Sequence, residues 1–179
     1  MLRNSDTGYG LIAKLFHWVL ALYLLGLFGF GKYIASMKVG IANLHYFNFH
    51  KVFGLIALTL ILLRLAWRYY SPPPPVLTEG AKPWELRLAH LTHAMLYVLM
   101  LAMPLTGWIA SSASGIRISM FGVFYVPLIA PPNETTEEVF FALHHWLSLL
   151  LAGFVALHIA GALKRHFVLR DRTLRRMWF

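Results

Sequence analysis

Histidine is the residue type in this sequence best suited to chemistry, because imidazole binds metals and is costly in an apolar segment without a partner. The chain has nine histidines among 179 residues. His144 and His158 are fourteen residues apart, and in an α-helix this spacing falls about 40° short of four full turns. Both therefore lie on one helix face, about 21 Å apart along the axis, whereas His145 lies about 140° from His158. The spacing predicts two imidazoles at two depths on one side of a helix.

Two further histidines match these depths. His50 lies near the start of its apolar segment, at the level of His144, and His17 lies near the start of another, at the level of His158. A pair of imidazoles from facing helices can hold a b-type haem in a bundle without covalent attachment. With both axial positions filled, such an iron carries electrons and does not bind oxygen. We expect two non-covalent haem b groups, with His17, His50, His144 and His158 as the iron ligands.

The absence of cysteine narrows the metal chemistry. It excludes disulfides, thiolate-bound zinc or iron–sulfur clusters, and haem attached through a C-x-x-C-H motif. Histidine is therefore the main candidate ligand. A histidine-lined transporter of metal ions or protons is the alternative from a different functional class.

A second pair of histidines competes for the inner position. His90 and His93 are three residues apart, on one face of their helix, at roughly the depth of His17 and His158. Either of them could replace His17 as an inner ligand, but His17 would then be buried without a partner. We prefer a reading in which His90 or His93 binds a haem propionate, serves a proton path or contacts a bound quinone.

Residues near these histidines fit a bound haem. Gly54 follows His50 by one helical turn and leaves room for a ring on that face. Arg64 and Arg68 are fourteen and eighteen residues after His50, at the inner depth, where propionates need cations. The two arginines are explained equally well by the tendency of basic residues to lie at the cytoplasmic end of a membrane segment. Arg165, seven residues after His158, has the same two interpretations.

Composition indicates that the solvent is a lipid bilayer. Hydrophobic residues make up 59% of the chain and charged residues 13%, too apolar for a soluble domain of this size. Segments long enough to cross a hydrocarbon core of roughly 30 Å cover about residues 11–34, 46–69, 86–111 and 139–163. We predict an all-α fold: one integral membrane domain over residues 1–179, built as a four-helix transmembrane bundle.

Basic residues orient this bundle. With the N-terminus inside, twelve of the sixteen lysines and arginines fall on the inner side, which predicts that both termini are cytoplasmic. The net charge of +9 is then explained by topology and by contact with membrane lipids, and no nucleic-acid partner is expected. The longest loop covers about residues 112–138. Its residues 116–129 mix aromatic side chains with Arg117, which predicts an interfacial segment over the outer end.

Short motifs follow one another along nearly the whole chain: FHW at residues 16–18, HKVFG at 50–54, RLAWR at 64–68, AHLTH at 89–93, PLTG at 104–107 and DRTLRRM at 171–177. In these motifs and their order the chain resembles the bacterial cytochrome b561 family, which is akin to the b-type subunits of hydrogenases and formate dehydrogenases. The resemblance implies two haems with the four ligands named above.

The resemblance also implies a role. It implies a multi-pass protein of the bacterial inner membrane that passes electrons between a periplasmic donor and a quinone, such as ubiquinone. One activity in the family is oxidation of superoxide at the outer face, which would make the chain a quinone-linked oxidoreductase. The alternative within the same class is a haem-bearing membrane anchor subunit of a larger dehydrogenase or hydrogenase.

Overall fold

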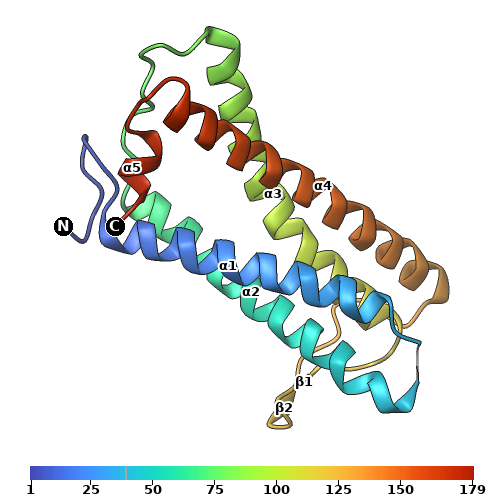
Figure 1. The fold of residues 1–179 in the computed structure, drawn as a ribbon. Coiled ribbons are helices and arrows are strands. Elements are labelled where there is room, and N and C mark those ends of the chain that lie inside the picture. The colour runs from blue at the N-terminus through green and yellow to red at the C-terminus, as the bar shows by residue number, and fades with distance from the viewer. Residues whose placement is uncertain (39) are drawn as a thin grey trace.

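The structure is a computed structural model that describes residues 1–38 and 40–179. In this part of the chain, four helices are long and apolar enough to cross a membrane (Figure 1). The N- and C-termini lie at the same end of the bundle, which we call the inner end, and the opposite end is the outer end. The predicted four-helix membrane bundle is thereby confirmed. The helices are α1 (Leu11–Ala35), α2 (Leu44–Tyr70), α3 (Pro83–Ala113) and α4 (Glu134–Phe167).

Helix α4 is longer than its apolar stretch predicts, starting five residues earlier and ending four later. The side chain of Asn133 caps it by accepting a hydrogen bond of 2.8 Å from the Thr136 backbone N–H. Glu134 and Glu137 occupy the first turn, and the last turn carries three basic residues, so both ends complement the helix dipole. Hydropathy detects only the part of a helix that meets lipid, so it does not reveal these polar turns.

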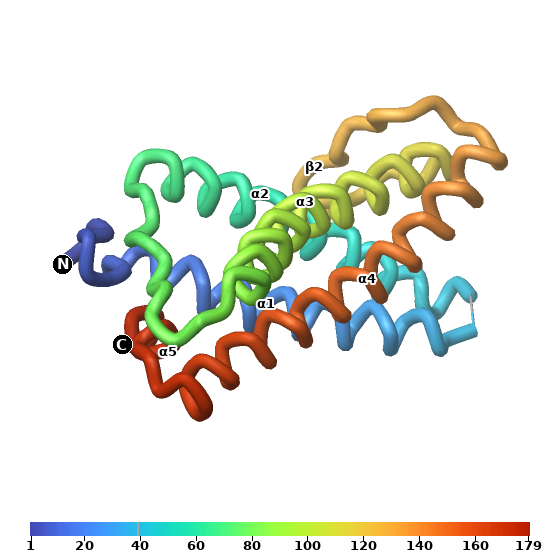
Figure 2. The backbone as a smooth tube through the Cα atoms, turned by 90° about the horizontal axis from the view of Figure 1, so that it is seen from above, coloured from blue at the N-terminus to red at the C-terminus, as the bar shows by residue number. Residues whose placement is uncertain are grey.

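Helices α1 and α2 pack together, α2 packs against α3, and α3 runs along α4 (Figure 2). A buried cluster of Leu20, Ala57, Ile61 and Met100 joins the first three helices near mid-bundle. No residue of α4 is buried. Neither α1 with α4 nor α2 with α4 forms a closely packed pair among the described residues. These are the two helix pairs that carry the facing histidines.

The C-terminal segment folds back onto the inner end, where the short helix α5 (Thr173–Met177) lies beside α1. The indole N–H of Trp18 donates to the Met177 carbonyl at 2.9 Å, and Lys14 Nζ donates to the Trp178 carbonyl at 2.6 Å. The turn between α4 and α5 holds an ion pair of 2.5 Å between Arg165 and Asp171. The last residues therefore close the inner end of the bundle.

The outer loop departs from an all-helical fold. A single 3-10 turn, η1 (Ile41–Asn43), joins α1 to α2 within the described residues, and strands β1 (Ser119–Met120) and β2 (Phe124–Tyr125) pair antiparallel between α3 and α4. We call residues 118–126 the outer hairpin. Phe121 and Gly122 both have positive φ, 53° and 78°, which closes its tight tip. The sequence predicted an interfacial segment here, but not its strands.

Candidate functional site

The outer pair of histidines faces across the bundle. His50 comes from α2 and His144 from α4, and their ring centroids are 6.3 Å apart, with planes at 88°. An iron bound linearly between two imidazoles separates the centroids by about 6.2 Å, given metal–nitrogen bonds of about 2 Å. Both side chains are half-buried. The spacing of this pair fits a bis-histidine haem.

Each outer imidazole lies against a glycine of a neighbouring helix. A β-carbon at Gly31 of α1 would stand 2.9 Å from Cε1 of His50. A β-carbon at Gly107 of α3 would stand 3.0 Å from Cε1 of His144. Any larger residue would push the rings out of position. The spacing of Gly31 from His17 predicts that α1 is narrow at this depth, whereas Gly107 is noted in the sequence only as the last residue of the PLTG motif and not as a partner of His144.

Hydrogen bonds orient the His144 ring. Its Nδ1 lies 3.0 Å from the Met103 carbonyl oxygen and 3.3 Å from the Thr106 hydroxyl of α3. A carbonyl only accepts, so Nδ1 carries the proton and Nε2 keeps a free lone pair. This is the usual state of a metal-ligating histidine. The Nδ1 atom of His50 is buried without a hydrogen-bond partner in residues 1–38 and 40–179. The donor set at the outer end is therefore compatible with iron.

The inner end brings three histidines together. The ring centroids of His17 on α1 and His158 on α4 are 6.1 Å apart, with planes at 56°. His93 on α3 lies 5.1 Å from the same His158 ring. Only the first distance approaches the separation that an iron between two imidazoles requires. The Nδ1 of His93 also donates to the carbonyl of Ala89 on its own helix at 2.8 Å, and the side chain is exposed.

Arg64 contacts the inner pair directly. Its Nη2 lies 3.1 Å from Nδ1 of His17. A guanidinium only donates, so Nδ1 is the acceptor and the ring proton lies on Nε2. A histidine that binds iron through Nε2 needs the opposite tautomer. Haem binding at His17 would therefore require Arg64 to turn away from the ring, and a propionate is the partner that a freed guanidinium would prefer.

The other predicted residues are placed as follows. Arg68 and Arg64 both lie over the Tyr97 ring of α3, at 5.2 Å and 5.9 Å, an aromatic contact that the sequence did not reveal. His90 is exposed. A β-carbon at Gly54 would meet nothing within 4 Å, so that face of α2 is open.

Arg165 binds the C-terminal segment and not the inner histidine pair. It forms an ion pair with Asp171 and donates hydrogen bonds to the Thr173 hydroxyl and the Leu77 carbonyl.

Neither pair belongs to a larger metal-ion site in the part of the chain that the structure describes. No group of three or more His, Cys, Asp or Glu residues in that part is arranged to hold a metal ion. A site with three or four protein ligands is typical of zinc and other transition metals. Paired histidines instead suit a metal whose remaining ligands come from a macrocycle. The donor set favours haem over the metal-transport alternative.

Comparisons with known proteins cover nearly the whole chain. Residues 8–179 match the family described as prokaryotic cytochrome b561. Cytochrome b561 homolog 2 of Escherichia coli (strain K12) is 33% identical over 175 residues, covering 97% of this chain and 93% of the relative. Cytochrome b561 homolog 1 of the same organism is 31% identical over 130 residues, covering 69% of each chain. The probable superoxide oxidase CybB of Yersinia pestis is 30% identical over 124 residues, again covering 69% of each.

Proposed function

Because the chain belongs to the prokaryotic cytochrome b561 family, we propose that it moves electrons across the membrane through two haem b groups. The protein is a multi-pass b-type cytochrome of the bacterial inner membrane and has an oxidoreductase-type role in electron transfer. The proposal adds the number of haems, their ligands and the direction of transfer. His50 and His144 hold the outer haem, and His17 and His158 hold the inner one.

The observation that supports this proposal is the presence of two facing histidine pairs at two depths. Their ring centroids are 6.3 Å and 6.1 Å apart. The two α4 histidines differ by fourteen residues, or about 21 Å of helix rise. One pair therefore lies toward each side of the membrane. Bound haem supplies one-electron redox chemistry, and two protein ligands leave its iron no open site for substrate.

The chain's own residues hold and tune these groups. Gly31 and Gly107 let the outer rings approach the neighbouring helices, and the Met103 carbonyl fixes the His144 tautomer. At the inner end, Arg64 lies beside His17 and Arg68 lies over the same Tyr97 ring as Arg64, so both supply positive charge there. Nearby fixed positive charge stabilises reduced iron and so raises its reduction potential.

We place the electron donor outside and a quinone at the inner end. One relative carries the name probable superoxide oxidase, and superoxide is therefore the donor that we propose to test. Two superoxide ions would each lose one electron and become dioxygen, and a quinone would take the two electrons and two protons to become a quinol. His93, beside the inner pair and partly open to the surroundings, is positioned to contact that quinone.

A haem count on variants of the outer pair tests the proposal. The purified protein should show the reduced-minus-oxidised spectrum of haem b and two haems per chain. His50→Ala and His144→Ala should each lose one haem, and the remaining haem should have the same potential in both. His145→Ala is the matched control, since His145 is the exposed neighbour of His144. A single haem in the unaltered protein, or two haems in either outer-pair variant, would contradict the proposal.

A further inference from the structure

The outer hairpin presents apolar side chains that nothing in the described chain covers. Val123 is 82% exposed, Tyr125 64%, and Phe121 and Phe124 each 56%. All four lie within five consecutive residues. A cluster of this kind on a protein surface marks a contact with lipid or with a partner. Its place in the fold decides between these two.

The base of the hairpin lies against α2, and its tip points sideways from the bundle, not beyond the outer end (Figure 1). Ile118 and Val126 are buried against Val52 of α2. The tip lies level with the same turn of α2, since the Phe121 ring centroid lies 6.3 Å from that of Phe53. Phe53 is nine residues into α2, or about 13 Å from its outer end. The tip is therefore at a depth where the surface of the bundle meets lipid.

Two hydrogen bonds clamp the hairpin to α2. The Asn48 side chain donates to the Ser119 carbonyl at 2.9 Å and accepts from the Ser119 backbone N–H at 3.0 Å. The backbone N–H groups of the tip also find partners inside the hairpin. Phe121 donates to the Ser119 carbonyl and Val123 to the Met120 carbonyl, both at 3.0 Å. A segment with internally satisfied N–H groups can enter the headgroup and upper acyl region at low cost.

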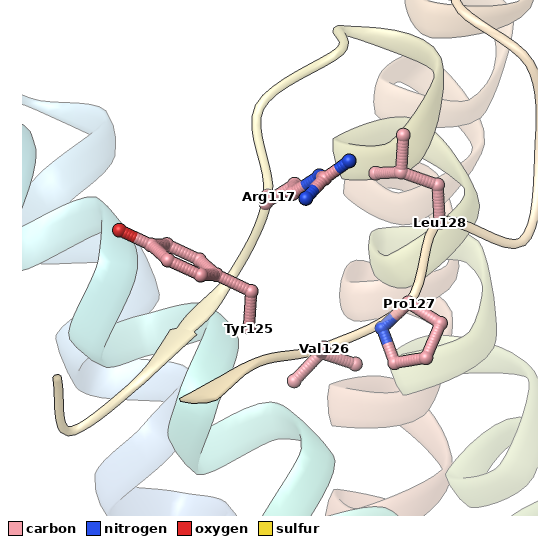
Figure 3. A pocket seen from close by; sticks show the side chains of 5 residues that line it. All are labelled: Arg117, Tyr125, Val126, Pro127 and Leu128. Carbon is pink, nitrogen blue, oxygen red and sulfur yellow. The ribbon is translucent and has the colours of Figure 1, made fainter. Parts of the chain in front are cut away.

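A cation lies at the base of the hairpin. Arg117 lines a pocket of about 320 Å³ with Tyr125, Val126, Pro127 and Leu128. Figure 3 shows the Arg117 and Leu128 side chains directed toward one another, while the Tyr125 ring points away. The pocket lining contains no acidic residue, and no carboxylate in the described ranges pairs with Arg117. A guanidinium beside apolar surface suits a phosphate attached to hydrocarbon chains.

We propose that the outer hairpin and Arg117 form a binding site for a phospholipid of the outer leaflet. The phosphate lies on Arg117, and the aromatic tip lies among the first carbons of the acyl chains. The site is continuous with the surface of α2, where only 17% of the apolar window is buried within the described chain. Quenching of a probe on the hairpin distinguishes lipid from a second copy of the chain or a protein partner that covers the same surface.

Depth measurements test the position of the tip. The natural chain has no cysteine, so single-cysteine variants can be labelled without background. Val123→Cys, Leu62→Cys in α2 and Glu138→Cys at the start of α4 would carry a fluorophore, in full-length protein reconstituted in vesicles. We expect phosphatidylcholine brominated near the headgroup end of its chains to quench the Val123 probe about threefold more than the Glu138 probe. Leu62, deeper in α2 and 52% exposed, should respond most to bromines near the chain ends.

Two results would overturn this part of the proposal. Equal quenching at Val123 and Glu138 would place the tip in water. Protection of Val123 from both brominated lipid and an aqueous quencher would show that protein covers the hairpin.

The amount of phospholipid that stays bound through purification tests the role of Arg117. Arg117→Gln should lower the phospholipid that stays bound through purification by about tenfold, whereas Lys32→Gln, an exposed outer cation on α1, should leave it unchanged. The haem spectrum of each variant confirms that the bundle has folded. Equal retention in both variants would contradict the site. Displacement of the retained lipid by inorganic phosphate at millimolar concentration would show a simple anion site and would also overturn the proposal.

Discussion

A β-carbon at Gly31 would stand 2.9 Å from Cε1 of His50, although the two residues belong to different helices. The imidazole of His50 occupies the position where a side chain of α1 would otherwise project. A β-carbon at Gly26 or Gly29 on the same helix would meet nothing within 4 Å. The three glycines are therefore not equivalent: of these three, only Gly31 lies against a candidate haem ligand, which leaves no room for a side chain there.

Gly31→Ala should displace the His50 ring and lower occupancy of the outer haem. Haem content should fall from about two to about one per chain, because the clash is with a ring that lies between two helices. Pyridine haemochrome analysis and a redox titration would measure the loss.

Gly29→Ala is the matched control for this variant. It adds the same methyl group to the same helix without a contact, and should keep both haems, with a small gain in stability of about 0.5–1 kcal/mol. Full haem content in Gly31→Ala would show that the outer ring can move without losing iron.

Arg64→Gln should lower the potential of the inner haem and leave the outer one nearly unchanged. The guanidinium lies at the inner pair, 3.1 Å from Nδ1 of His17, and once freed from that ring it would pair with a propionate of the inner haem, so its charge acts mainly on that haem. We expect a shift of about 60 mV, equal to about 1.4 kcal/mol for one electron. A potentiometric titration that resolves the two haems measures it.

Arg68→Gln should act in the same direction but less strongly, because Arg68 is exposed. Arg87→Gln serves as a control, since Arg87 is an exposed cation near the inner end of α3. Unchanged potentials in both the Arg64 and the Arg68 variants, at normal haem content, would make these arginines topological anchors only.

His17→Ala should remove the inner haem, whereas His93→Ala should keep both haems. The reason is distance: His17 lies 6.1 Å from His158 across the bundle, and His93 lies too close, at 5.1 Å. Haem quantification with a redox titration separates the two variants. The reverse outcome, with His93→Ala losing a haem and His17→Ala retaining both, would move the inner ligand to α3.

Asp171→Asn should destabilise the inner end of the bundle. The Arg165–Asp171 pair is 2.5 Å long, with side chains only 14% and 10% exposed, so the change leaves a shielded cation unpaired at a cost of about 1–3 kcal/mol. Thermal loss of the inner haem absorbance should occur a few degrees lower. Glu85→Gln breaks the more exposed Lys164–Glu85 pair and should cost less than about 1 kcal/mol. An equal effect of the two substitutions would contradict a special role for the C-terminal segment.

The spans and the histidine pairs could be predicted from sequence because both depend on helical periodicity. A spacing of fourteen positions places His144 and His158 on the same face of a helix, whatever packs against that helix. In the structure His50 lies opposite His144, and His17 lies opposite His158. The polar turns that lengthen α4 could not be predicted from hydropathy. Asn133 does carry a capping signal, which would have located the start of the helix.

Contacts between distant segments could not be predicted. Nothing in the sequence connects Gly107 with His144, or Tyr97 with Arg64, because these contacts depend on how α3 crosses its neighbours. The sequence allows Arg165 to serve either a propionate or the topology of the chain, but Asp171 lies only six residues further on and pairs with it. The position of a residue along the membrane normal does not reveal an ion pair of this kind with a residue close by in the sequence.

The angle between paired imidazole planes has a magnetic consequence. The planes stand at 88° in the outer pair and at 56° in the inner pair. In a ferric haem with two imidazole ligands, crossed planes leave two iron d orbitals nearly equal in energy, whereas less crossed planes separate them. With these angles kept on haem binding, the outer haem would give a strongly anisotropic low-spin signal in electron paramagnetic resonance, and the inner haem a more rhombic one. The loss of one signal in His144→Ala and of the other in His17→Ala would then assign each signal to its side of the membrane.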